Sequence, residues 1–524
     1  MSLTKQNTTD GASVTHKPTN SDAERLEQLG IQDELVRDYS LPSLVGLCLC
    51  LMGTWEASSA VLTQALLSGG APCLFYNFLL TFFCTLAIGA SLAEIASIYP
   101  TAGGQYHWVT ALAPRSVNKF AGWITGWISL GGQIVLTASP AFISGLMVQG
   151  LVNLNDDTYI GTRWQGMLFY WAFVIYAAVM NVWGHRFLPM ANLISGVLHV
   201  GCFVIAFVVL AAMSRKNSAE FVFTEVSNQT GWPNDGIAWM VGLISTIYPF
   251  LGYDAACHLA EEIPHAARNV PIAIVGSITI NGLMGLAFAT MLLFSIGSLE
   301  DLLATTTGFP FIQLFLDITK SHAGATILSL FPIIIAMAAA VAGVTSTSRT
   351  LWAFARDHAT PFSGFLSHVS QEKQVPVRAI WTIVILQIVL GFIYLASSTA
   401  FNAILSMAIV SMYASYIIPI AAMLFGGRGR VRSTDYGPFK LGQPLGVILN
   451  IVSVGWILVS MVFSTFPSVM PTTADNMNYS IVVVMGWLVF GILFYLVSGR
   501  RKFEMPIVSA GLIMGIPLTA DPAA

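Results

Sequence analysis

Charged residues are scarce in this chain: 9% of its 524 residues are Asp, Glu, Lys or Arg, whereas 55% are hydrophobic. An average soluble domain carries about 25% charged residues, so the composition excludes a water-soluble fold. The net charge is only −3, and no long basic run is present. Binding to the phosphate backbone of nucleic acids is therefore excluded as well.

Several catalytic and processing signals are also missing. The chain contains neither an H-E-x-x-H nor a G-x-S-x-G motif, so we predict no enzyme activity and no cofactor. The polar residues 1–40 lack the apolar core of a secretory signal peptide, so the first apolar segment must itself start membrane insertion. All six cysteines fall in apolar stretches, where they act as small apolar residues, and we expect no disulfide and no metal site: Cys48, Cys50, Cys73, Cys84, Cys202 and Cys257.

Long apolar runs are what the chain has in abundance. Because a bilayer core of about 30 Å needs roughly twenty apolar residues per helix, these runs predict about twelve transmembrane helices. They do not alternate in the manner of barrel strands, so the predicted fold is an all-α integral membrane protein. The expected spans are 42–66, 71–97, 117–150, 167–187, 190–213, 236–260, 270–298, 322–356, 376–396, 399–426, 444–466 and 477–499.

The distribution of basic residues predicts the orientation. With both termini cytoplasmic, all lysines and arginines except Arg163, Arg215, Lys216 and Lys320 lie on the cytoplasmic side, as the positive-inside rule requires. We therefore expect a disordered cytoplasmic tail over 1–41, a transmembrane domain over 42–499 and a cytoplasmic C-terminal tail over 500–524.

Two glycosylation sequons, at Asn228 and Asn478, fall in loops that this orientation places outside. Glycosylation and ordinary polar loop sequence are equally compatible with them. Passage through the secretory route favours the plasma membrane over the vacuolar membrane as the host.

Helix-breaking residues interrupt the first and the sixth predicted spans. Gly53 precedes Thr54-Trp55-Glu56 in the first, and Pro249, Gly252 and Asp254 lie close together in the sixth. Breaks in these two spans are typical of two inverted five-helix repeats, here followed by two extra helices. Unwound backbone at mid-membrane can hold a small charged ligand, although a simple kink relieved by neighbouring helices is the alternative.

Two stretches resemble a known family. Residues 252–262 (GYDAACHLAEE), followed by Pro264, Arg268 and Val270-Pro271, resemble the sixth-helix signature of the amino acid-polyamine-organocation superfamily. Residues 91–108 (SLAEIASIYPTAGGQYHW) are similar to its fungal branch, the GABA and choline permeases. With 346–357 and 436–439, the resemblance runs from about residue 40 to 500.

The resemblance implies a secondary transporter that imports a small amine-bearing solute by alternating access, driven by a cation gradient that is usually of protons. An amino acid, GABA or a choline-like compound would be the substrate. The alternatives are a polyamine permease and a non-transporting nutrient receptor on the same fold. The residues that match the unwound helices, and so the predicted substrate site, are Gly53, Thr54, Trp55, Glu56, Ala57, Phe250, Gly252, Tyr253 and Asp254.

One departure from the family pattern is the bulky, acidic Trp55-Glu56, where many amino acid permeases have small residues. Trp55 can offer its ring face to an ammonium, a contact worth about 0.5–2 kcal/mol, and Glu56 can neutralise the charge. The alternative is that Trp55 packs on a neighbouring helix and Glu56 binds a backbone amide.

Other polar residues within the spans are candidates for proton coupling. His199 takes the place where some proton-coupled relatives carry a lysine, and its imidazole can titrate near physiological pH. A neutral His199 bonded to a carbonyl is the alternative. Thr345 and Ser346 either line the same cavity or bond to their own helix.

Charged residues at the cytoplasmic helix ends are candidates for an inner gate. Salt bridges among them would close the gate and bias the position of the broken sixth helix, while solvated surface charge is the alternative. These residues are Glu94, Glu261, Glu262, Arg268 and Arg349.

Overall fold

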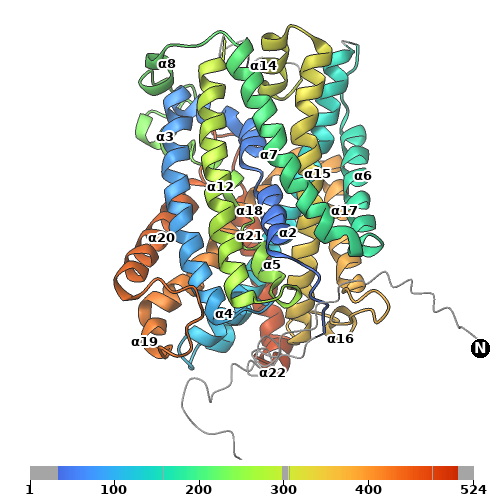
Figure 1. Cartoon of the computed structure of the whole chain (residues 1–524), viewed down its shortest axis with the longest axis vertical. Helices are drawn as coiled ribbons and strands as arrows, with labels where there is room; N and C mark the ends of the chain where they lie inside the picture. Colours follow the sequence, from blue (N-terminus) through green and yellow to red (C-terminus); the bar gives the residue numbers. More distant parts are fainter. Residues whose placement is uncertain are drawn as a thin grey trace, which may run out of the picture.

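The computed structural model describes residues 34–505, apart from residues 157, 298–301, 303–304, 306 and 475 (Figure 1). Most of the predicted tails, 1–33 and 506–524, therefore lie outside the described residues. The described chain is helical and contains no strand. We call the end that carries α4, α16, α19 and α22 the inner end, and the end that carries α8 and α14 the outer end (Figure 1).

Long helices form the body of the molecule. They are α2 (Leu41–Met52), α3 (Thr54–Ile98), α5 (Asn118–Asn155), α6 (Arg163–Val182), α7 (Leu188–Met213), α12 (Ala266–Ser295), α15 (His322–Arg356), α17 (Val377–Ala396), α18 (Ser398–Ala422), α20 (Gln443–Phe463) and α21 (Ser480–Phe494).

Shorter elements connect or interrupt them. They are α4 (Gln105–Leu112), η1 (His185–Phe187), α8 (Ala219–Phe223), α9 (Asp235–Val241), α10 (Ile244–Ile247), η2 (Tyr248–Phe250), α11 (Ala255–His258), η3 (Ala260–Glu262), α14 (Pro310–Thr319), α16 (Ser363–Leu366), η4 (Met423–Gly427), α19 (Arg428–Arg430), η5 (Tyr495–Gly499) and α22 (Arg500–Lys502).

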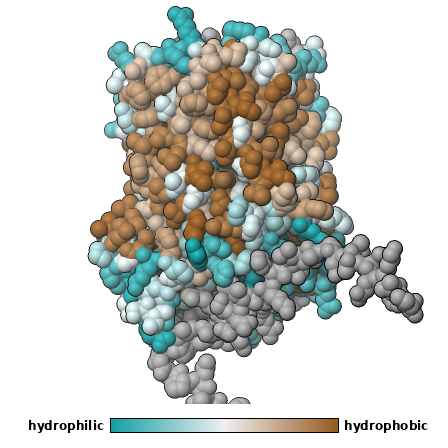
Figure 2. Space-filling model, viewed as in Figure 1, coloured by the Kyte–Doolittle hydropathy of each residue, from teal (hydrophilic) through white to brown (hydrophobic). Residues whose placement is uncertain are grey.

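The number of spans agrees with the predicted twelve. Within the described residues, 11 helical segments are long and apolar enough to cross a membrane. The first of these, Leu41–Ile98, contains non-helical backbone at Gly69 and Gly70, which divides it into two spans. Apolar side chains cover the middle of the surface while polar ones gather at both ends (Figure 2). The chain is a multi-pass membrane protein.

The first and sixth spans are both discontinuous, as predicted. α2 ends at Gly53, whose φ of 48° is left-handed, and α3 begins directly after it. In the sixth span η2 ends at Phe250, a non-helical turn follows, and α11 begins at Ala255. Gly252 in that turn has a φ of 106°, a conformation that residues with a Cβ rarely adopt.

Small residues bring four helices together in pairs beside the first break. A Cβ on Gly196 of α7 would lie 2.9 Å from the Cα of Gly46 in α2, so the two backbones are almost in contact. A Cβ on Gly285 of α12 would lie 2.9 Å from the hydroxyl of Thr54. This close packing, common between membrane helices, holds α7 against α2 and α12 against the start of α3.

Candidate functional site

A cavity lies between the two broken helices. Residues of α2, α3, α5, η2 and α15 line it, and nearly all of them are apolar. The hydroxyl of Tyr248 is already bonded to Ser139, at 2.6 Å. Glu56 is the only charged side chain among the described lining residues.

Glu56 is buried, and its two carboxylate oxygens differ. Oε1 lies 2.7 Å from Nδ1 of His199, whose side chain is fully buried. Oε2 has no hydrogen-bond partner among the described residues and lies beside Gly53, 3.5 Å from where a Cβ would be. An unpaired buried carboxylate oxygen at a cavity wall is suited to bind a cation.

Asn281 of α12 extends this polar group. Its Oδ1 lies 3.0 Å from Nε2 of His199, and its Nδ2 donates to the carbonyl of Leu49, at 3.1 Å. Thr54 donates its hydroxyl to the backbone carbonyl of Asn281, at 2.7 Å. Asn281 was not predicted; the only sequence signal was a lone amide in the apolar run 270–298.

Three of the nine predicted substrate residues line the cavity: Gly53, Glu56 and Ala57. Trp55 is fully buried and packs on Phe288, with ring centroids 5.0 Å apart. Its ring centroid is 6.4 Å from that of His199. Trp55 thus takes the packing role that was the alternative, and Glu56 binds a histidine rather than a backbone amide.

The sixth span presents different residues from those predicted. Tyr248 and Leu251 line the cavity, whereas Phe250 packs on Phe78, with ring centroids 5.2 Å apart. Gly252 lies against Leu51 of α2. Tyr253 packs on Tyr416 of α18, with ring centroids 5.4 Å apart.

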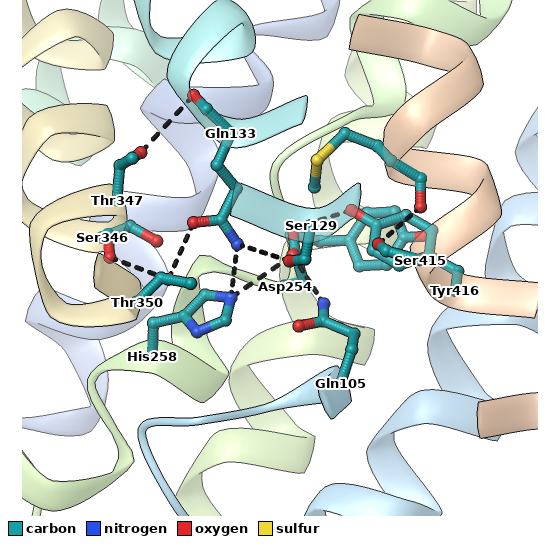
Figure 3. Close-up of polar contacts among 12 residues, drawn as sticks. Gln105, Ser129, Gln133, Asp254, His258, Ser346, Thr347, Thr350, Ser415 and Tyr416 are labelled. Carbon is teal, nitrogen blue, oxygen red and sulfur yellow. Dashed lines mark hydrogen bonds and ion pairs between the residues drawn. The ribbon is translucent and has the colours of Figure 1, made fainter. Parts of the chain in front are cut away.

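Asp254 belongs to a separate buried polar cluster that ties the sixth span to its neighbours (Figure 3). Its Oδ1 accepts a hydrogen bond from the hydroxyl of Tyr416 at 2.7 Å, and its Oδ2 accepts one from Nε2 of Gln105 at 2.8 Å. Asp254 is therefore bonded to α18 and α4, and it is not among the cavity-lining residues.

Through His258, hydrogen bonds extend this cluster to side chains of α5 and α15. Its Nδ1 donates to the carbonyl of Ala102 at 2.9 Å, and its Nε2 lies 2.8 Å from Nε2 of Gln133 (Figure 3). Thr350 of α15 donates to Oε1 of Gln133 at 2.7 Å. We call the residues Gln105, Gln133, Asp254, His258, Thr350 and Tyr416 the inner barrier.

Buried ion pairs lie nearer the inner end. Arg349 binds Glu262 through two bonds, of 2.7 and 3.2 Å, and Arg356 binds Glu261 through bonds of 3.0 and 3.2 Å. Because both glutamates are buried and paired, they are not solvated surface charges, which was the alternative to a gate. Arg356 was not among the predicted gate residues.

The other predicted gate residues behave differently. Glu94 pairs with Arg428 in α19 and accepts from the backbone N–H of Leu441 at 3.0 Å. Arg268 is exposed, and no ion pair joins it to another described residue. Beside Arg356, burial raises the pKa of Asp357 to about 7, although Arg356 and a hydrogen bond from Tyr106 act to lower it.

Thr345 and Ser346 do not line the cavity. The hydroxyl of Thr345 lies 2.8 Å from Oδ1 of Asn181 in α6 and 2.9 Å from the carbonyl of Val341, so its one hydrogen has two acceptors in reach. Ser346 lies beside the inner barrier, where its carbonyl accepts from Thr350 at 3.2 Å. A part for either residue in proton coupling remains a prediction.

The two sequon asparagines are engaged in folded loops. Nδ2 of Asn228 donates to the carbonyl of Trp232 at 2.9 Å, and Nδ2 of Asn478 donates to that of Ser464 at 2.8 Å. Glycosylation at either site remains a prediction, and it would have to precede the formation of these bonds.

Comparison with known proteins identifies the family. The profile of the family described as "Amino acid permease" matches residues 39–488, which include both helix breaks, the cavity and the buried glutamates of the two ion pairs. The chain belongs to the amino acid permease family. This agrees with the resemblance found in the sequence.

Relatives of this permease cover most of its length. It is 33% identical over 474 residues to the choline transporter of Saccharomyces cerevisiae, covering 90% of this chain and 83% of the relative. It is 33% identical over 443 residues to a putative amino acid/polyamine transporter of Macrophomina phaseolina, covering 83% and 96%. It is 29% identical over 518 residues to amino-acid permease 2 of Neurospora crassa, covering 96% and 94%.

Proposed function

We propose that this permease imports a small amine-bearing solute together with protons, by alternating access. The observation that carries the proposal is the unpaired Oε2 of Glu56 in an otherwise uncharged cavity between two broken helices. The relatives support it, because they are named as transporters of choline and as amino-acid permeases.

The two helix ends at Gly53 complement the ends of an amino acid. Carbonyl groups at the C-terminus of α2 carry partial negative charge and suit an ammonium, as does Glu56. The first N–H groups of α3 have no side-chain cap and suit a carboxylate. Because no lysine or arginine is among the described lining residues, a cation such as choline is favoured over an amino acid.

Closure of the inner end supports alternating access. The inner barrier and the Glu262–Arg349 pair are buried, and in the Glu261–Arg356 pair Glu261 is buried while Arg356 is 19% exposed, which supports a closed inner end. Release of a solute into the cytoplasm would require these contacts to break. His199, bonded to the carboxylate that faces the solute, is the proposed proton carrier.

Uptake of labelled choline, GABA, amino acids and polyamines in a permease-deficient host, at two external pH values, tests the proposal. Glu56→Gln should reduce uptake of cationic solutes more than that of neutral ones, because it removes the charge that faces the cavity. Glu220→Gln, at an exposed position of α8, is the matched control and should transport normally. Equal transport of every solute by Glu56→Gln would contradict the proposed role of the carboxylate.

His199→Ala tests the coupling separately. The variant should lose the pH dependence of uptake, and an unchanged pH profile would remove His199 from that role. A plasma-membrane location, supported by the predicted outer sequons, is checked by imaging a fluorescent fusion in the same cells.

A further inference from the structure

The hydrogen bonds around Asn281 determine which of its amide atoms faces His199. The carbonyl of Leu49 can only accept a hydrogen bond, so the atom of Asn281 that lies 3.1 Å from it must be the NH₂ nitrogen. The amide oxygen is therefore turned toward Nε2 of His199, 3.0 Å away. Asn281 is fully buried, so bulk solvent does not compete for either bond.

This orientation determines the tautomer of His199. A carbonyl-type oxygen at hydrogen-bond distance requires that Nε2 carry a proton. A neutral imidazole has only one N–H, so Nδ1 of a neutral His199 would be a bare acceptor facing Oε1 of Glu56, at 2.7 Å. Two acceptors at that distance repel each other, so the contact needs one additional proton between Nδ1 and Oε1.

We propose that Asn281 is a positioning residue that makes the Glu56–His199 contact conditional on a bound proton. The proton holds Oε1 of Glu56 on His199, and this leaves Oε2 of this cavity-lining residue unpaired. Each carboxylate oxygen then serves one cation, the proton on one side and the amine of the solute on the other. The proton and the solute therefore bind together rather than compete, as symport requires. This role of Asn281 rests on the proposed function and deepens it.

Few other ionisable groups surround this pair. Glu56 is the one charged side chain in contact with His199 among the described residues. The thiols of Cys50 in α2 and Cys202 in α7 lie near enough to Glu56 to interact with its charge. α12 contributes the neutral Asn281, and the described part of α15 places no charged side chain on the pair.

Asn281→Leu and Asn281→Gln separate this role from a structural one. Leucine has a similar size but no acceptor, so neutral His199 is free to place its single proton on Nδ1 and hold Glu56 at any pH. In proteoliposomes, choline uptake by the wild type should fall as the pH rises, by up to about tenfold per pH unit, because the contact needs one bound proton. Uptake by Asn281→Leu should change less than about twofold over the same range. Asn281→Gln, which keeps both the amide acceptor and the NH₂ donor and adds no charge, should retain the wild-type profile.

A merely structural Asn281 would lower uptake equally at every pH, and a wild-type pH profile in Asn281→Leu would overturn the inference. Should that variant not fold, ¹⁵N NMR of histidine-labelled wild-type protein, with His199→Gln to assign the signal, gives a second reading. We expect Nε2 to be protonated at every pH at which the fold persists. A neutral His199 with a bare Nε2 would refute the inference, whereas absence of uptake of any panel compound would refute only the proposed function.

Discussion

Removing the charge of Glu262 should open the inner end of the permease. Arg349 and Glu262 are 1% and 7% exposed, so Glu262→Gln leaves a buried guanidinium without its counter-charge. Breaking a buried pair in this way costs about 3–5 kcal/mol. Because about 1.4 kcal/mol corresponds to a tenfold change in an equilibrium constant, the open state should gain at least ~100-fold relative to the closed one.

Hydrogen exchange of the purified protein in nanodiscs measures this opening. The amides of 255–262, which belong to α11 and η3, should exchange about a hundredfold faster in Glu262→Gln than in the wild type. Asp435→Asn is the matched control, because the Arg432–Asp435 pair is more exposed, at 43% and 18%, and such pairs contribute only ~0–1 kcal/mol. Equal exchange in the wild type and Glu262→Gln, or an equal increase in both variants, would refute a gating role for the buried pair.

Three further predictions concern the helix break, the packing of the C-terminal segment and the response to acid. Gly53→Ala should destabilise the protein by about 1–2 kcal/mol in a thermal-shift assay and abolish uptake, because Gly53 has a left-handed φ of 48°. The control Gly201→Ala, whose added Cβ would lie in open space, should change neither stability nor uptake. Phe503→Ala should remove about 3–5 kcal/mol, since Phe503 is 1% exposed, whereas Phe425→Ala, at 79% exposed, should leave the melting temperature nearly unchanged. Burial lowers the pKa of His107 to about 3, so as the pH falls the unfolded chain binds a proton before the folded one does, and the free energy of unfolding should fall below ~pH 6.5. His107→Gln should lose less of this free energy between ~pH 6.5 and ~pH 4 than the wild type does. Equal losses in the two proteins would contradict this account.

The break positions were accessible to sequence reasoning because they depend on local chemistry. Gly53 and Gly252 adopt backbone conformations that other residues avoid, and an acid beside each break signalled a polar interior. Sequence could not say which way each acid points. Glu56 faces the cavity, whereas Asp254, at the corresponding place in the sixth span, bonds to Gln105 and Tyr416.

For the charged residues too, sequence reasoning found most of the positions but not the partners. Glu261, Glu262 and Arg349 were predicted at the gate from their positions at helix ends, and they are paired there. Arg268, predicted on the same grounds, is exposed instead. Which arginine meets which glutamate depends on how α11, η3 and α15 pack, and these elements are far apart in the sequence.

Sequence alone determined that the chain crosses a membrane about twelve times and that its first and sixth spans are broken, because hydrophobic length and glycine conformation are local properties. Only the tertiary structure brought His199 and Asn281 to Glu56, since that contact joins α3, α7 and α12, residues separated by 143 and 82 positions. A hydrogen bond depends on the distance and direction between two atoms in space. In this permease, the close approach of Gly46 to Gly196 and of Gly285 to Thr54 sets the distance and direction between the side chains on these helices.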